Sequence, residues 1–233
     1  MGKNLIQQRR GKGSIFKAPK HRAKGIVRLA PVKSAETGVV RDIITTVYHS
    51  APLLVVHFGT EKRLMLAPEG VCVGDTVSSS ATEIRSGNTF KLKDLPEGTL
   101  VHNIEAVFGD GGKFIRSSGV FGRIAQKTAK GISVVMPSGG NKIFKEECRA
   151  TVGVLAAGGR LDKPFMKAGN KFKAMKAKGH KYPKVCGISM NAVAHPFGSK
   201  CSHIKGRPTQ SSRHAPPGRK VGKIAPSRTG YKR

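Results

Sequence analysis

The carboxyl-terminal 71 residues of this chain, 163–233, contain 18 lysines and arginines and no aspartate or glutamate. A segment with so much charge of one sign does not collapse into a core of its own, because its cations repel one another and have no carboxylate to pair with. It needs a polyanion around it to adopt one structure. Residues 163–233 are therefore not expected to fold by themselves, and their charge indicates nucleic acid as a partner.

The charges divide the chain into three parts. Residues 1–35 contain 10 basic and 0 acidic residues, residues 36–162 contain 15 and 13, and residues 163–233 contain 18 and 0. The net charge of +30 far exceeds the value of about 2 to 8 that keeps a small domain soluble. We expect a basic N-terminal arm at 1–35, a nearly neutral globular middle, and a basic C-terminal extension at 163–233.

The arm has neither a helical nor a strand period, and its glycines and Pro19 interrupt any helix. It is predicted to be extended and to contact phosphates along a groove. The alternative is a solvated or targeting tail. The candidate contacts are Arg9, Arg10, Lys12, Lys17, Lys20 and Arg22.

The middle is predicted to be mostly β. In 36–88, β-branched or apolar runs predict strands at 38–47, 53–58, 63–67 and 71–77, which favours a small OB-like barrel. In 89–162, further runs favour an SH3-like barrel, with strands at 99–107, 118–124, 132–136, 142–145 and 150–155. One larger barrel across both sets is the alternative.

Five phenylalanines of the middle are candidates for stacking on bases. The other interpretation is that they form the core of the barrels, as aromatic residues more often do. They are Phe90, Phe108, Phe114, Phe121 and Phe144.

The extension begins with a possible short basic helix in 164–181 and continues as a coil rich in Pro, Gly and Ser. A basic amphipathic helix is also typical of membrane or calmodulin targets, but fifty further residues of cationic coil favour RNA or DNA. Within 186–208, Pro196 keeps His195 out of the helical region, and Gly187 and Gly198 permit close approach of backbone. We expect a turn-rich loop that presents the His195 imidazole.

Metal and enzyme chemistry are disfavoured. Cys186, His195, Cys201 and His203 lie within eighteen residues but lack the paired spacing of a zinc site, so we expect no metal and no cofactor. A cysteine nucleophile with His195 or His214 as base would need an enclosed pocket and an orienting group. The extension has no acid to provide one, so we expect no enzyme.

The four cysteines are widely scattered, no secretory signal precedes them, and no apolar run reaches the length of a membrane span. We expect reduced thiols, an intracellular location and no membrane partner.

Four stretches carry a resemblance over nearly the whole chain: MGKNLIQQRRGKGSIFKAPKHR, CRATVGVLAAGGRLDKPFMKAGNKF, MNAVAHPFG and HAPPGRKVGKIAPSRTG. The chain resembles the universal large-subunit ribosomal proteins of the L-two family in their archaeal and eukaryotic form. The resemblance implies an OB-like barrel followed by an SH3-like barrel, both bound to large-subunit rRNA, and two tails that thread the RNA. It also implies a place near the peptidyl transferase centre and links to subunit association and transfer-RNA binding.

The family's histidine-proline loop approaches that centre, and the resemblance carries it onto Met190, Asn191, His195, Pro196 and Gly198. It also marks Arg116 and Arg149, which fall where the barrel motifs of the family are basic. The chain departs from the family at Gly198-Ser199-Lys200, where a triple glycine is usual, and Ala192 and Ala194 replace a proline and an acid. We therefore expect a loop that differs in detail.

We predict a structural, non-catalytic constituent of the large ribosomal subunit, with rRNA, neighbouring ribosomal proteins and, indirectly, tRNA as partners. Its location would be the cytoplasm, with a nucleolar stage in a eukaryotic host. A stand-alone architectural DNA-binding protein is the alternative. For His195 we expect support of the RNA scaffold, since a general base must reach the reacting amine. The further candidate RNA contacts are Arg160, Lys167, Lys171, Lys200, His203, Arg207, Arg219, Lys220 and Arg228.

Overall fold

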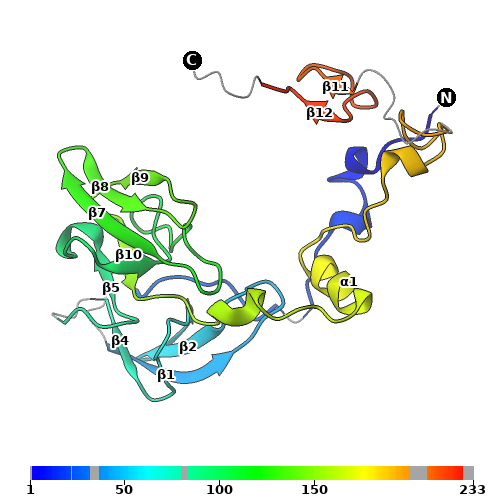
Figure 1. Ribbon diagram of the computed structural model, residues 1–233. Helices are drawn as coiled ribbons and strands as arrows, with labels where there is room; N and C mark the ends of the chain where they lie inside the picture. The colour runs from blue at the N-terminus through cyan, green and yellow to red at the C-terminus, as the bar shows by residue number, and fades with distance from the viewer. Residues whose placement is uncertain (1, 22, 32–36, 80–82, 200–208, 228–233) are drawn as a thin grey trace. The chain divides into compact units, whose positions relative to one another are not determined.

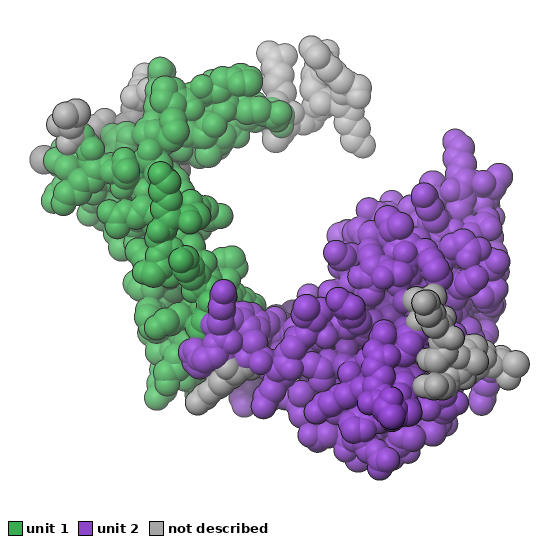
Figure 2. Space-filling model, turned by 180° about the vertical axis from the view of Figure 1, so that it is seen from behind, with its two compact units in different colours: residues 1–19, 165–233 green, residues 20–164 purple. Residues whose placement is uncertain are grey.

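A computed structural model describes residues 2–21, 23–31, 37–79, 83–199 and 209–227. The chain forms two compact units, which Figure 2 distinguishes by colour. Unit 1 consists of Met1–Pro19 and Phe165–Arg233, and unit 2 is Lys20–Pro164.

The first sheet of unit 2 is antiparallel, with strand order β3-β2-β1-β4 (Figure 1). Its strands form where β-branched and apolar residues cluster, as predicted for the first three. Gly59 adopts a φ of 54° in the two-residue turn after β2, where Phe58 pairs with Glu61. The strands are β1 (Thr37–Ile44), β2 (Leu53–Phe58), β3 (Glu61–Leu66) and β4 (Thr76–Ser78).

The strand predicted at 71–77 is wrong over most of its length, because β4 begins only at Thr76. The carboxylate of Asp75 accepts a hydrogen bond from the Cys72 amide at 2.8 Å. Gly74, between them, has a φ of 97°. A side-chain-capped turn therefore occupies the residues that composition alone assigned to a strand.

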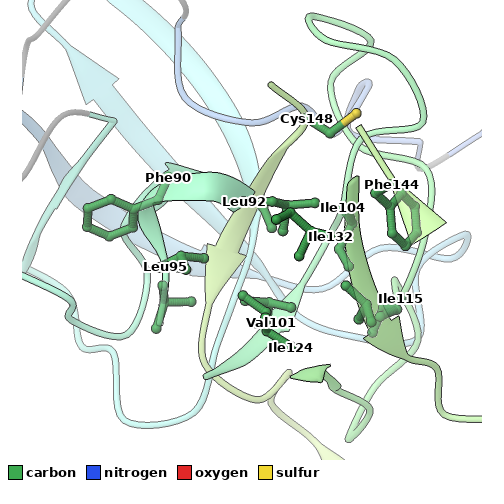
Figure 3. Packing of buried hydrophobic residues seen from close by; sticks show 13 residues of the cluster. Phe90, Leu92, Leu95, Val101, Ile104, Ile115, Ile124, Ile132, Phe144 and Cys148 are labelled. Carbon is green, nitrogen blue, oxygen red and sulfur yellow. The ribbon is translucent and has the colours of Figure 1, made fainter. Parts of the chain in front are cut away.

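The second sheet has the order β5-β10-β6-β7-β8-β9 (Figure 1). Its core cluster includes Leu92, Ile104 and Val134, each fully buried, and Figure 3 shows the cluster extending from Phe90 to Phe144. The strands are β5 (Thr89–Lys91), β6 (Leu100–His102), β7 (Gly122–Thr128), β8 (Gly131–Val135), β9 (Asn141–Phe144) and β10 (Arg149–Val152), and two 3-10 turns, η3 (Leu92–Asp94) and η4 (Gly158–Leu161), complete the unit.

The predicted mostly β fold is confirmed, and the strands of unit 2 form two antiparallel sheets within one compact unit. Two strand predictions need correction. The strand expected at 99–107 ends at His102, because Asn103 turns the chain with a φ of 50°. The strand expected at 118–124 begins only at Gly122, and β5 was not predicted at all.

Part of the predicted arm belongs to the core of unit 2. Val27 forms a parallel bridge with Leu64, and Leu29 and Ala30 are fully buried. Side chains alternate here, since Ile26 and Arg28 point outward while Val27 and Leu29 are buried. This short strand-like period was missed because basic residues interrupt it.

Unit 1 has little regular structure. The predicted short basic helix is present as α1 (Ala168–Ala177), and no residue of it is buried. A small cluster of Leu5, Phe197 and Val221 joins three parts of the chain that are far apart in sequence. The other elements are the 3-10 turns η1 (Ile6–Arg9), η2 (Ser14–Phe16) and η5 (Gly187–Ser189) and the short strands β11 (Gln210–Ser211) and β12 (Lys223–Ile224).

Candidate nucleic-acid interface

Unit 1 carries a positive charge that nothing within it balances. It contains 22 lysines and arginines, five in 1–19 and 17 in 165–233, whereas all 13 acidic residues of the chain lie in 36–162. The cations of unit 1 therefore have no carboxylate side chain in their own unit. This arrangement is the electrostatic footprint of a nucleic-acid binder.

Among the cations of the basic arm, Arg9 lies in η1, and Arg10 and Lys17 directly follow η1 and η2. The guanidinium carbon of Arg10 lies 5.3 Å from the centre of the Phe16 ring, a cation–π distance that ties η1 to η2. Arg22 lies outside the described residues. The described candidates of the arm are all exposed: Arg9, Arg10, Lys12, Lys17 and Lys20.

Helix α1 presents lysines on several sides. Lys167 immediately precedes the helix, Lys171 lies in its first turns, and both are exposed. The ammonium of Lys171 lies 5.4 Å from the centre of the Tyr182 ring. A ten-residue helix with no buried face is marginal by itself, so it depends on its surroundings to persist.

The C-terminal candidates are held by a compact turn around Ser211. The Ser211 hydroxyl lies 2.9 Å from the carbonyl oxygen of Arg219 and 2.6 Å from that of Val221. Arg219 is exposed and Lys220 half-buried. The remaining candidates of this part, Lys200, His203, Arg207 and Arg228, lie outside the described residues.

The loop at 186–199 is closed by its own backbone. The Ser199 amide donates to the Met190 carbonyl at 3.0 Å, and the His195 amide donates to the Asn191 carbonyl at 3.1 Å. A methyl group added at Gly198 would overlap with the backbone of Met190 and Asn191. The close approach expected at Gly198 is confirmed.

His195 is half-buried in this loop and packs against Gly187, where a methyl group would overlap with its ring. Its Nδ1 accepts a hydrogen bond from the Phe197 amide at 3.1 Å, and the two rings lie 5.1 Å apart. Burial lowers the pKa of His195. Because Nδ1 accepts from the Phe197 amide, the neutral form of the imidazole carries its proton on Nε2, and Pro196 beside it is exposed.

Ser199 lies in a turn of the loop and has a left-handed backbone conformation. It adopts a φ of 57°, a conformation that favours glycine. Its Oγ accepts a hydrogen bond from the Ala192 amide at 3.0 Å. The hydroxyl therefore supplies a contact across the loop that offsets part of the backbone strain.

Three candidate arginines lie in 36–162, and they differ in how far other groups already pair with their charge. Arg149 is buried, and its Nη2 lies 2.8 Å from the carboxylate of Glu105, so its charge is not offered to a phosphate. Arg116 is half-buried and donates to two carbonyls, and burial lowers its pKa. Arg160 is exposed and donates to the Ser118 hydroxyl at 2.8 Å.

The five phenylalanines divide between the two interpretations. Phe90 and Phe144 are buried in the core cluster, and Phe114 packs against it. Phe108 and Phe121 are 43% and 44% exposed. Of the five, only these two remain candidates for stacking on a base.

Sequence reasoning missed a basic groove on unit 2. It has a volume of about 750 Å³ and lies between residues 24–28 and the first sheet, with Arg41 and Lys62 in its lining. Arg41 sits at a β-bulge between Val40 and Asp42 and is exposed. The groove was overlooked because the nearly neutral charge of 36–162 averages over all faces of the unit, and the sequence does not show which cations share one face.

In the described part of the chain, no three His, Cys, Asp or Glu side chains come together as a metal site would require. Cys186 is exposed there, and Cys201 and His203 lie outside the described residues. Among those described residues, none of the helices has both the length and the apolar character that crossing a bilayer demands.

Comparisons with known proteins agree with this picture. The family model "Ribosomal Proteins L2, C-terminal domain" matches residues 85–219. The chain is 48% identical over 241 residues to "Large ribosomal subunit protein uL2" of Methanosphaera stadtmanae, covering 100% of both chains. It is 49% identical over 239 residues to the protein of that name from Archaeoglobus fulgidus, with 100% of both covered, and 48% identical over 235 residues to that of Haloarcula marismortui, with 99% and 98% covered.

Proposed function

The chain belongs to the L2 family of ribosomal proteins, and from this premise we propose that it is a structural constituent of the large ribosomal subunit. In this proposal it binds large-subunit rRNA and contacts neighbouring ribosomal proteins. The cytoplasm is its site of action. The similar proteins named above are archaeal, which gives a nucleolar stage no basis here.

The observation that carries the proposal is the acid-free composition of unit 1. The 22 cations of this unit repel one another, and no acidic side chain of the unit pairs with them. The apolar cluster around Leu5, Phe197 and Val221 is too small to offset this repulsion. Ribosomal RNA supplies the phosphates that neutralise it. The proposed contacts are the exposed cations of 1–35 and 163–233, together with Arg160 and the loop at 186–199, whereas Arg149 is left out because Glu105 already neutralises it.

His195 has a supporting role in this proposal. Its Nδ1 is occupied by the Phe197 amide, and its ring packs on Gly187, so it helps to fix the loop. Its Nε2 proton is free to donate to an RNA oxygen. We propose that the loop braces RNA near the peptidyl transferase centre, and that any effect on tRNA binding or subunit association is indirect.

Salt dependence tests the RNA contacts directly. Each phosphate contact contributes about 0.7 to 0.9 to the slope of log affinity against log salt. We expect the pair Arg9→Ala and Arg10→Ala to reduce the slope for large-subunit rRNA by about 1.4 to 1.8. Lys130→Ala, an exposed lysine of the turn after β7, is the matched control and should leave the slope unchanged.

Sedimentation separates the proposal from the alternative, an architectural DNA-binding protein. Tagged full-length chain expressed in cells should sediment with large subunits and leave them only after ribonuclease treatment or at very high salt. If it instead sediments free of ribosomes, or binds duplex DNA as tightly as rRNA at equal salt, the ribosomal assignment of this chain is wrong.

A further inference from the structure

Unit 1 contains a cavity of about 1080 Å³ among the arm, α1, the segment that follows α1, and the loop at 186–199. We propose that this cavity takes one unstacked nucleotide of single-stranded RNA, with its base against the rings of Phe16 and Tyr182 and its phosphates on Arg10 and Lys171. The inference rests on the proposed function, and it adds that this site binds an unpaired nucleotide of the RNA.

The walls of the cavity combine two half-buried aromatic rings with cations. Arg10 lies 5.3 Å from the Phe16 ring, and Lys171 lies 5.4 Å from the Tyr182 ring. Each ring therefore has its own cation close by. Aromatic platforms next to positive charge are the arrangement by which proteins hold single-stranded nucleic acid.

The chemistry of the lining selects the ligand. Met175 and Met190 add apolar, polarisable surface that suits a flat ring, and Lys181 and Lys184 add two more cations. No residue of unit 1 is acidic, so a cationic peptide has nothing to pair with. A nucleotide offers both an apolar ring face and an anionic phosphate.

The cavity also favours an unpaired base over a duplex. A base within a duplex is stacked on its neighbours and cannot lie against a protein ring, whereas a base in a loop or bulge can turn out of the stack. The volume of about 1080 Å³ is slightly above the range for small-molecule sites, about 300 to 1,000 Å³. It admits a base together with its flanking backbone.

The chain contains no tryptophan, which makes a direct optical test possible. Tyr182→Trp places a single indole in the cavity of the full-length protein. Phe172→Trp places one on α1 at a position that is 47% exposed and does not line the cavity. The probes are a short single-stranded oligoribonucleotide, the same sequence as a duplex, and adenosine monophosphate. Binding of each RNA is measured separately by the fluorescence anisotropy of a label at its end.

We expect the saturating single strand to quench the emission of Trp at 182 by about half or more, through stacking. The same RNA should quench the indole at 172 much less, and the bound duplex should quench neither. In a second arm, Tyr182→Leu combined with Phe16→Leu should weaken single-strand binding about tenfold or more, while Phe172→Leu keeps it within about twofold.

Equal quenching at positions 172 and 182, or equal quenching by the duplex, overturns the base-capture proposal while RNA binding itself stands. Quenching by the mononucleotide at the concentration at which the oligonucleotide acts means that the site takes free nucleotides, and also overturns it. If neither RNA binds, the proposed function fails together with the inference.

Discussion

Replacing Arg149 by methionine removes the cation of a buried ion pair in unit 2. The Arg149 side chain is 8% exposed and that of its partner Glu105 is 0% exposed. The guanidinium donates to both carboxylate oxygens, at 2.8 and 3.3 Å, and also to the Ala30 carbonyl at 2.8 Å. One side chain therefore joins β10, the turn after β6 and the segment at 27–30.

Removing one partner of a buried pair leaves an unpaired charge in a region of low dielectric constant, at a cost of about 3 to 5 kcal/mol. The two backbone amides that also donate to Glu105, those of Gly111 and Arg149 itself, remain. They offset part of that cost, so we expect Arg149→Met to lower the free energy of unfolding of unit 2 by about 3 kcal/mol.

Urea unfolding of the full-length protein measures this, because urea adds no salt to screen the charges. At an m-value of about 2 kcal/mol/M, the midpoint should fall by about 1.5 M. Hydrogen exchange of β10 and of residues 29–30 assigns the change to unit 2. Arg63→Met is the matched control. Arg63 also donates to a carbonyl of this segment, that of Leu29, but its partner Glu61 lies at the surface. The control should lower the free energy of unfolding by only about 1 kcal/mol.

A double variant decides whether the ion pair is the cause. Glu105→Gln with Arg149→Met leaves no charge buried, so its cost should be smaller than the sum of the two single costs by about 2 kcal/mol. Additive costs, or an Arg149→Met midpoint no lower than that of Arg63→Met, would show that the pair is not what holds these elements together.

Three further perturbations test individual sites. Burial lowers the pKa of His102 from 6.5 to about 4, so the unfolded chain binds a proton before the folded chain does as the pH falls. The unfolding free energy of unit 2 should therefore drop by about 2 kcal/mol between pH 6.5 and 4.5. The urea midpoint of His102→Gln should lack this share of the pH dependence. Gly198→Ala should speed amide exchange of the loop at 186–199 in assembled subunits about 5- to 150-fold through overlap with backbone, while Gly218→Ala, where a methyl group meets nothing within 4 Å, should not. Ser199→Ala should speed the exchange of the Ala192 amide about 2- to 10-fold, because it loses one hydrogen bond, and an unchanged rate would contradict the role assigned to the hydroxyl.

Local composition predicted the strands that are defined by their own residues. The run at 53–58 became β2 with the same bounds, because its valines and leucines suit a buried strand and Gly59 supplies the turn. It could not predict β5. That strand is three residues long and exists because Thr89–Lys91 pairs with β10, about sixty residues later in the chain, which is a tertiary effect.

The candidate site was predictable as a region but not residue by residue. Charge alone identified the segments that need a polyanion, since an acid-free composition does not depend on the fold. It could not distinguish Arg149 from the exposed cations, because the partner Glu105 is 44 residues away in sequence. Nor could it find the groove beside Arg41, whose basic character depends on which side chains share one face of a sheet.

The N-terminal segment explains why the boundary drawn by charge, at residue 35, differs from the boundary drawn by packing, at residue 19. Val27 forms a parallel bridge with Leu64, and successive side chains of a strand-like segment point to opposite sides. Val27 and Leu29 are buried, while Arg28 is exposed and lines the groove on unit 2. Such a segment belongs to the core by one face and to the cationic surface by the other, so neither criterion alone locates the end of the arm.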